Sequence, residues 1–107
     1  MSTRLHKPWR SISDVPHVLK GHLGVFQLAN AAQEVIYIGF AGGNSRLGLR
    51  GEVQSVLTEL SDAVYFRHEI TSSYMTRYRE LMMVHVHDYG VLPVANPPIK
   101  LGKLSPG

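Results

Sequence analysis

Residues suited to holding a phosphate gather between Ala41 and Arg50. Gly42 and Gly43 are adjacent, and a glycine loop lets backbone N–H groups come close to an anion. Arg46 and Arg50 follow where a helix is predicted to begin, so free helix-start amides and a guanidinium would attract the same phosphate. The stretch lacks the Gly-Lys-Ser/Thr of a P-loop, which argues against nucleotide hydrolysis. The alternative interpretation is an ordinary turn.

A second group of charged residues is predicted on a helix over Tyr74–Tyr89. Arg77 is a candidate phosphate contact there, and Glu80 is a candidate carboxylate ligand. The helix also carries His85 and His87, but residues two apart do not face one another on a helix. A helical two-histidine metal site needs a spacing of three or four residues. The histidine spacing therefore argues against such a site.

Hydrophobic periodicity predicts the elements that position these residues. Two apolar, β-branched runs over Leu23–Ala29 and Glu34–Phe40 indicate a β-hairpin with a medium loop. Apolar residues at i, i+4, i+7, i+8 and i+11 predict a helix over Leu49–Leu60. A third strand is predicted over Ala63–Ile70, before the helix over Tyr74–Tyr89. This order indicates an α/β (α+β) domain with a small three-stranded antiparallel sheet flanked by helices.

Alternation along the second predicted strand assigns its side chains to two faces. Val35 and Tyr37 should share one face, and Ile36 and Ile38 the other. A half-exposed Tyr37 could then present its hydroxyl at the sheet surface. An ordinary strand tyrosine is the alternative.

Alternation along Ala63–Ile70 is the clearest in the chain. Val64, Phe66, His68 and Ile70 share one face, which we expect to turn toward the helices. A histidine within an apolar face is usually a core residue with its hydrogen bonds satisfied. We therefore interpret His68 as a core residue rather than as a ligand.

Composition suits a single globular domain. The chain has 107 residues, 44% of them hydrophobic and 18% charged, and no cysteine. No apolar run approaches the roughly 18 residues of a membrane span, and the first residues do not resemble a signal peptide. We therefore expect a cytoplasmic protein without disulfides or a membrane span. The predicted organisation is an N-terminal arm over 1–20, a domain over 21–97 and a flexible basic tail over 98–107.

The formal net charge of +3 comes from the two ends of the chain, because acids outnumber arginines in the body between them. Nucleic-acid binding would therefore depend on basic arms and local arginines, whereas basic ends kept for solubility are the alternative. The cations of the ends are Arg4, Lys7, Arg10 and Lys20 in residues 1–22, against Asp14, and Lys100 and Lys103 in residues 97–107.

Two tripeptides carry a family resemblance. Gly24-Val25-Phe26 followed by Tyr37-Ile38-Gly39 resembles the paired signature of the GIY-YIG nuclease superfamily, with Phe26 where the family usually has tyrosine. Pro93-Val94-Ala95-Asn96 is similar to the segment that follows the family's glutamate-bearing helix. The resemblance covers about residues 21–97. It implies a metal-dependent endonuclease that hydrolyses phosphodiester bonds, acting on DNA in preference to RNA.

The resemblance also implies roles for individual residues. Glu80 would hold one divalent ion, Mg²⁺ or Mn²⁺, although it lies one turn before the family position near Val84. Tyr37 would act as the base or orient the attacking water. Arg50, or failing it Arg46, would neutralise charge that builds on the phosphate. The remaining residues expected to bind substrate are Gly39, Gly42, Gly43, Arg77 and Asn96.

Two departures from the family pattern favour a different function on the same scaffold. Phe26 lacks the hydroxyl of the family's first tyrosine, and Glu80 is out of register. The alternative is a catalytically impaired GIY-YIG scaffold that binds nucleic acid or a protein. The acidic body of the chain also fits a small interaction domain with no nucleic-acid role.

Overall fold

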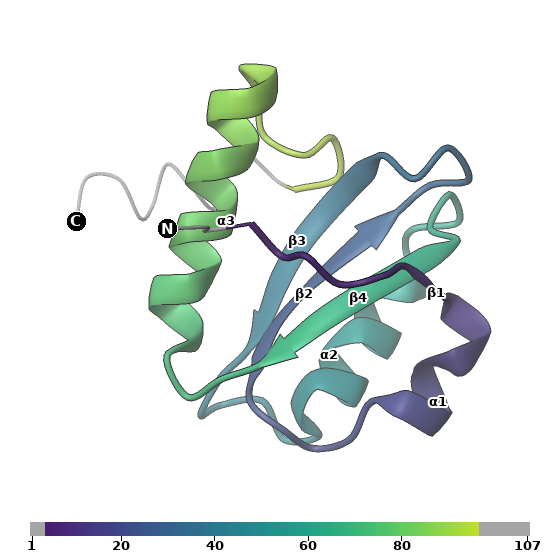
Figure 1. Ribbon diagram of the computed structural model, residues 1–107. Coiled ribbons are helices and arrows are strands. Elements are labelled where there is room, and N and C mark those ends of the chain that lie inside the picture. Colours follow the sequence, from purple (N-terminus) through teal and green to yellow (C-terminus); the bar gives the residue numbers. More distant parts are fainter. Residues whose placement is uncertain (1–3, 97–107) are drawn as a thin grey trace.

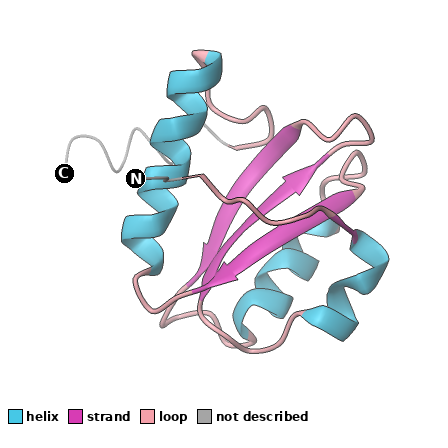
Figure 2. Cartoon of the chain, viewed as in Figure 1, coloured by secondary structure: helices cyan, strands magenta, loops and turns pink. Residues whose placement is uncertain are grey.

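Helices cover both faces of one antiparallel sheet in the computed structural model, which describes residues 4–96. Helix α3 lies against one face, and α1 and α2 lie against the other (Figures 1 and 2). The predicted tail over 98–107 lies outside the described residues. The elements are β1 (Arg10–Ser11), a 3₁₀ turn (Ile12–Asp14), α1 (Val15–Val18), β2 (Gly24–Ala29), β3 (Val35–Ala41), α2 (Gly48–Leu57), β4 (Tyr65–Ile70) and α3 (Tyr74–Tyr89).

The sheet has four strands in the order β1-β4-β2-β3, so the predicted count of three is wrong. The predicted hairpin is confirmed, because β2 pairs antiparallel with β3, and β2 also pairs with β4. The additional strand is the two-residue β1, in which Arg10 pairs with Phe66 and Ser11 with Tyr65. This strand comes from the N-terminal arm. It pairs with the outer edge of β4, which would otherwise expose unpaired backbone groups.

A β-bulge in β3 changes which side chains share a face. Leu28 pairs with Tyr37, but the next residue of β2, Ala29, pairs with Val35. Ile36 is therefore an extra residue, and it packs with Tyr37 on the α2 side, whereas Val35 packs on the α3 side. The predicted faces, Val35 with Tyr37 and Ile36 with Ile38, are therefore wrong.

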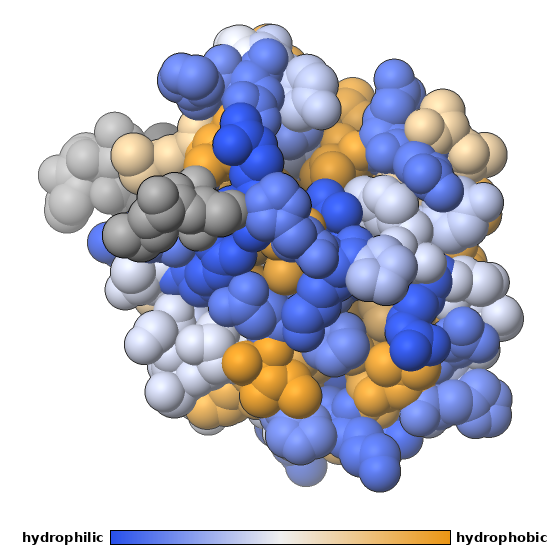
Figure 3. Space-filling view, viewed as in Figure 1, coloured by the Kyte–Doolittle hydropathy of each residue, from blue (hydrophilic) through white to orange (hydrophobic). Residues whose placement is uncertain are grey.

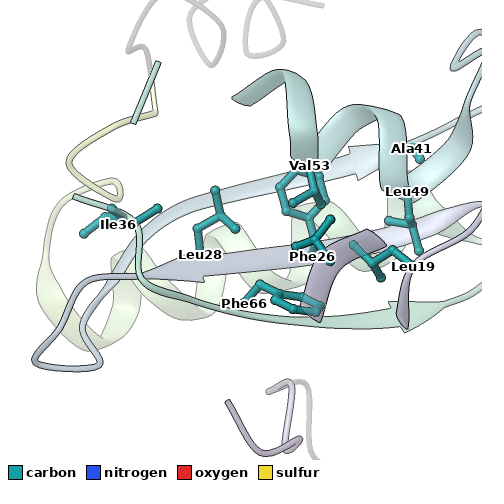
Figure 4. Packing of buried hydrophobic residues seen from close by; sticks show 10 residues of the cluster. Leu19, Phe26, Leu28, Ile36, Ala41, Leu49, Val53 and Phe66 are labelled. Carbon is teal, nitrogen blue, oxygen red and sulfur yellow. The ribbon is translucent and has the colours of Figure 1, made fainter. Parts of the chain in front are cut away.

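The core beneath α2 holds the larger group of buried side chains. Phe26 and Leu28 of β2 contact Leu49 and Val53 of α2, and Phe66 of β4 completes the layer (Figure 4). Ile70 was expected to face the helices but is 53% exposed. Within β4, Phe66 belongs to this cluster, whereas Ile70 is at the far end of the strand and does not belong to it.

The core beneath α3 binds the N-terminal arm to the rest of the fold. Leu5 of the arm is buried there with Val25, Ile38 and residues of α3. The arm then crosses the face of the sheet toward β1 (Figure 1). Arg4 donates two hydrogen bonds to the Asp88 carboxylate, at 2.7 and 2.9 Å. The predicted arm over 1–20 thus contributes to both the core and the sheet.

The two long helices lie where the 3.6-residue spacing places them. α3 has the predicted bounds, Tyr74–Tyr89, and Gly90 ends it in the left-handed conformation with a φ of 77°. α2 was predicted over Leu49–Leu60 and runs over Gly48–Leu57. Within residues 4–96 no helix is long and apolar enough to span a membrane.

Candidate functional site

Phe26 and Tyr37 lie side by side over Gly39, on the α2 face of the hairpin. Phe26 pairs with Gly39, and the Phe26 and Tyr37 rings stack with their centroids 5.9 Å apart. A Cβ atom added to Gly39 would lie 2.5 Å from the Phe26 ring and 2.8 Å from the Tyr37 ring. Gly39 is therefore needed for close packing of two aromatic rings, and the structure gives it no contact that would mark a role in binding substrate.

The surroundings of Tyr37 keep its phenol protonated. Burial is the main cause that raises the Tyr37 pKa, with smaller contributions from Tyr78 and from the carboxylates of Glu52 on α2 and Glu59 in the turn after it. The hydroxyl has no hydrogen-bond partner among the described residues, yet it is not a buried unsatisfied atom, so it reaches solvent. A raised pKa opposes a role as base. The hydroxyl remains able to orient a bound molecule.

The two candidate arginines do not join Tyr37 in one site. Successive helix residues are about 100° apart, so Arg50 and Glu52 project about 160° apart around the axis of α2. The charge of Glu52 acts on Tyr37, so the Arg50 side chain, on the opposite side of α2, projects away from Tyr37. Arg46 is exposed in the turn before α2. The side of α2 near Tyr37 is therefore acidic.

The glycine loop already uses two of its amides within the fold. The Gly42 N–H donates to the Ser45 hydroxyl at 3.0 Å, and the Gly43 N–H donates to the Tyr74 hydroxyl at 3.2 Å. Ser45 in turn donates to Glu52 at 2.9 Å. These bonds fix the loop to α2 and α3. The amides proposed to meet a phosphate are therefore occupied.

Glu80 lies on the α3 side of the sheet, opposite the face that carries Tyr37. Its carboxylate is 3.3 Å from Nη1 of Arg77, and Arg77 also bridges Glu69 of β4 at 3.1 Å. Arg77 is mostly buried in this network and donates to the Arg4 carbonyl. The expected grouping of Glu80 with Tyr37 is therefore not found, and the expected role of Arg77 in binding substrate competes with these contacts.

The donor set does not fit the metal site implied by the resemblance. Residues 4–96 contain no group of three or more His, Asp or Glu side chains placed to hold an ion. A single-carboxylate Mg²⁺ site would still need Glu80 beside the phosphate that Tyr37 and an arginine engage. Glu80 lies across the sheet from Tyr37 and is already paired with the Arg77 guanidinium, which it shares with Glu69.

Asn96 braces the edge of the sheet. Its side-chain amide accepts a bond from the Ile38 N–H and donates one to the Ile38 carbonyl, both at 2.9 Å. The Ala95 N–H adds a third bond, to the Ile36 carbonyl, at 2.8 Å. Asn96 thus replaces the neighbouring strand that β3 lacks on this edge. With both amide atoms used, it has a structural role in place of the expected contact with substrate.

A basic surface lies along β4. The sequence alone did not predict that its residues come together. Burial lowers the His68 pKa, and the charges of Lys7, Arg10 and His22 lower it further. His68 is half-buried and stacks on the buried Phe66 with the ring centroids 6.3 Å apart, so it lies at the margin of the core. In the sequence, the excess of cations in residues 1–22 was the feature that indicated a basic surface. Their position over β4 depends on the strand pairing of β1.

Trp9 anchors the arm beside this surface. The Arg67 guanidinium lies 4.0 Å from the centre of the Trp9 ring, within the range of a cation–π contact. Arg67 also donates to the Lys7 carbonyl. We name the exposed Lys7, Arg10 and His22, together with the half-buried His68, the arm surface.

Residues 3–88 match a family described as a domain of unknown function, DUF7508. The chain belongs to the DUF7508 family. The DUF7508 match takes in the arm, every strand and all of α3 except Tyr89. It therefore includes the arm surface, but not the Pro93–Asn96 segment that braces β3. No curated protein and no solved structure is significantly similar to the chain.

Proposed function

We propose that this DUF7508 domain is a GIY-YIG-like scaffold that binds nucleic acid through its arm surface without cleaving it. The observation that carries the proposal is the pairing of β1 with β4, which brings the exposed Arg10 to the edge of the sheet that holds His68. The charges of Lys7, Arg10 and His22 lower the His68 pKa after burial, in keeping with a basic edge. Phosphate contacts with such cations supply most of the affinity of non-specific nucleic-acid binding.

The packing of the hairpin supports the scaffold. The Phe26 ring stacks on Tyr37 above Gly39. The two tripeptides that resemble the family signature therefore pack against each other across β2 and β3. A helix follows the glycine loop, and Asn96 returns to the edge of β3. The Tyr-Ile-Gly and Asn elements thus have structural roles in this fold that do not depend on Glu80.

The arrangement around Tyr37 argues against cleavage. Phe26 is 1% exposed and has no hydroxyl, so it cannot position a water. The Tyr37 phenol holds its proton, and the nearest acids raise its pKa. Glu52 and Glu59 would also repel a phosphate from this side of the molecule. The arm surface is free of that repulsion, although Asp14 lies 4.0 Å from Arg10.

Salt dependence tests the arm surface. Binding of labelled single-stranded DNA, duplex DNA and RNA, measured by fluorescence anisotropy, should weaken steeply as salt rises. The double variant Lys7→Gln/Arg10→Gln should flatten the log–log slope by about 1.4–1.8, because each lost phosphate contact contributes about 0.7–0.9. Arg46→Gln/Arg50→Gln makes the same change of charge elsewhere and should leave the slope nearly unchanged. Absence of binding at low salt would favour the interaction-domain function instead.

Cleavage assays test the other half of the proposal. Incubation of each nucleic acid with the protein and Mg²⁺ or Mn²⁺ should yield no product. Cleavage that survives purification, and that Glu80→Ala or Tyr37→Phe removes while binding persists, would contradict the proposal and restore the endonuclease. Arg50→Lys should also remove any such cleavage, because lysine cannot reproduce the planar guanidinium.

A further inference from the structure

A small cavity of about 170 Å³ lies between the arm, the sheet and the second half of α3. It is on the face that the arm crosses, where hydrophilic residues surround smaller apolar patches (Figure 3). Its walls come from elements far apart in the sequence, including Leu5 of the arm, Gln27 of β2 and Val84 of α3. It is separate from Tyr37 and from the arm surface.

One end of the cavity presents hydrogen-bond donors. Gln27 is 6% exposed, and its Oε1 accepts from Nε of Arg67 at 2.7 Å. Its Nε2 has no partner among the described residues and yet is not a buried unsatisfied atom, so it opens into the cavity. Nη2 of Arg67 is likewise without a partner among those residues, whereas Nη1 donates to the Lys7 carbonyl. Two donors, one of them cationic, thus lie side by side.

The donors are held rigidly before any ligand arrives. Gln27 and Arg67 are directly opposed on β2 and β4, and Trp9 stacks on the Arg67 guanidinium at 4.0 Å. Val35, Leu81 and Val84 give the cavity an apolar wall, and Arg4, His6, His85, Asp88 and Tyr89 also line it. The Asp88 carboxylate is paired with Arg4 at 2.7 Å. A polar cationic end and an apolar wall suit a molecule with one anionic group and a hydrocarbon body.

We propose that this cavity binds a small organic carboxylate with an apolar body the size of a single ring. The carboxylate oxygens accept hydrogen bonds from Nε2 of Gln27 and Nη2 of Arg67, and the body packs against Val35 and Val84. A cavity of about 150 Å³ admits one benzene ring, so 170 Å³ sets a similar limit. Drug-sized ligands need about 300 Å³ or more and are excluded.

Titration of the ¹⁵N-labelled full chain with sodium benzoate, without nucleic acid, tests the proposal. Saturable chemical-shift changes should appear below about 10 mM at the Gln27 side-chain amide, Val35 and Val84. Benzyl alcohol has the same ring without the charge, and inorganic phosphate has charge without a ring. Both should bind at least tenfold more weakly. Equal binding of benzyl alcohol, or no saturable change with benzoate, would overturn the proposal.

Substitutions test the position of the ligand. Val84→Phe should fill the cavity and abolish the benzoate shifts, whereas Val86→Phe makes the same change on the exposed face of α3 and should leave them intact. Gln27→Leu should weaken benzoate binding at least tenfold. If Gln27→Leu fails to fold, Arg67→Lys, which keeps the charge but loses the planar donor, should give the same loss. Unchanged affinity in Val84→Phe would overturn the assigned site.

Discussion

At the scale of single residues, His68 reports most directly on the proposed binding surface. Its folded-state pKa is lowered first by burial and then by Lys7, Arg10 and His22. The neutral form is favoured on folding, so the associated stability is present above the unfolded pKa of 6.5 and is lost as pH falls through the lower folded value. The same cations that lower the pKa would bind a phosphate.

Nucleic acid should therefore raise the His68 pKa, because a bound phosphate adds negative charge beside the ring. Lys7→Gln should raise it without nucleic acid. Lys20→Gln removes a nearby charge that does not act on His68 and should have little effect. Titration of the histidine ring signals by NMR measures both shifts. A His68 pKa that is the same with and without saturating nucleic acid would rule out binding at the arm surface.

Gly39 supports a second prediction at this scale. Gly39→Ala should destabilise the fold by about 1–3 kcal/mol, because the new methyl group overlaps the Phe26 and Tyr37 rings. Gly43→Ala is the matched control, since its Cβ would meet only the Tyr74 hydroxyl at an ordinary 3.8 Å. Urea unfolding of the two variants gives the comparison. Equal stability of both would refute the close packing over Gly39.

At the scale of elements, β3 depends on its edge brace. Asn96→Ala should leave the Ile38 N–H and carbonyl without partners, at a cost of about 1–3 kcal/mol for each buried group. Amide exchange of Ile38 should quicken accordingly, while Asn44→Ala in the exposed loop should change neither stability nor exchange. If the Ile38 amide remains protected from exchange in Asn96→Ala, groups other than Asn96 form the hydrogen bonds at this edge of β3.

At the scale of the whole molecule, the arm joins both cores and closes the small cavity. Leu5 is buried beneath α3, whereas Arg10 and Ser11 extend the sheet beyond β4. Arg4 and Asp88 fasten the start of the arm to the end of α3. The arm surface and the cavity both depend on this placement, so release of the arm should affect both.

Acid should release the start of the arm. The hydrogen bond from Arg4 is the main cause that holds the Asp88 pKa below its ordinary 3.8. The stabilisation is present above that value and is lost as pH falls through the depressed folded pKa. Amide hydrogen exchange of residues 4–9 should quicken over that window in the wild type. Asp88→Asn should show fast exchange already at neutral pH, whereas Asp62→Asn should behave as wild type. Slow exchange in Asp88→Asn would show that the other contacts of the arm, Leu5 in the core and the hydrogen bonds to the Arg4 and Lys7 carbonyls, retain it without Asp88.

Local periodicity was sufficient for the main elements. The α3 bounds follow from a 3.6-residue apolar pattern that ends at Gly90, and the hairpin follows from two β-branched runs. The bulge at Ile36 could not be predicted in this way, because an extra residue shows only when both strands are paired. The two-residue β1 has no pattern of its own and forms because β4 offers it an open edge.

The sequence by itself determined β2, β3, β4, α2 and α3, and it placed Tyr37 and Gly39 within one hairpin. Tertiary structure alone decided that Glu80 lies across the sheet from Tyr37, and that the side of α2 facing Tyr37 carries Glu52 and not Arg50. It also decided that the arm cations gather at His68. The reason is that periodicity assigns a residue to a face of its own element. The faces that then meet are chosen by burial of apolar surface across the whole chain.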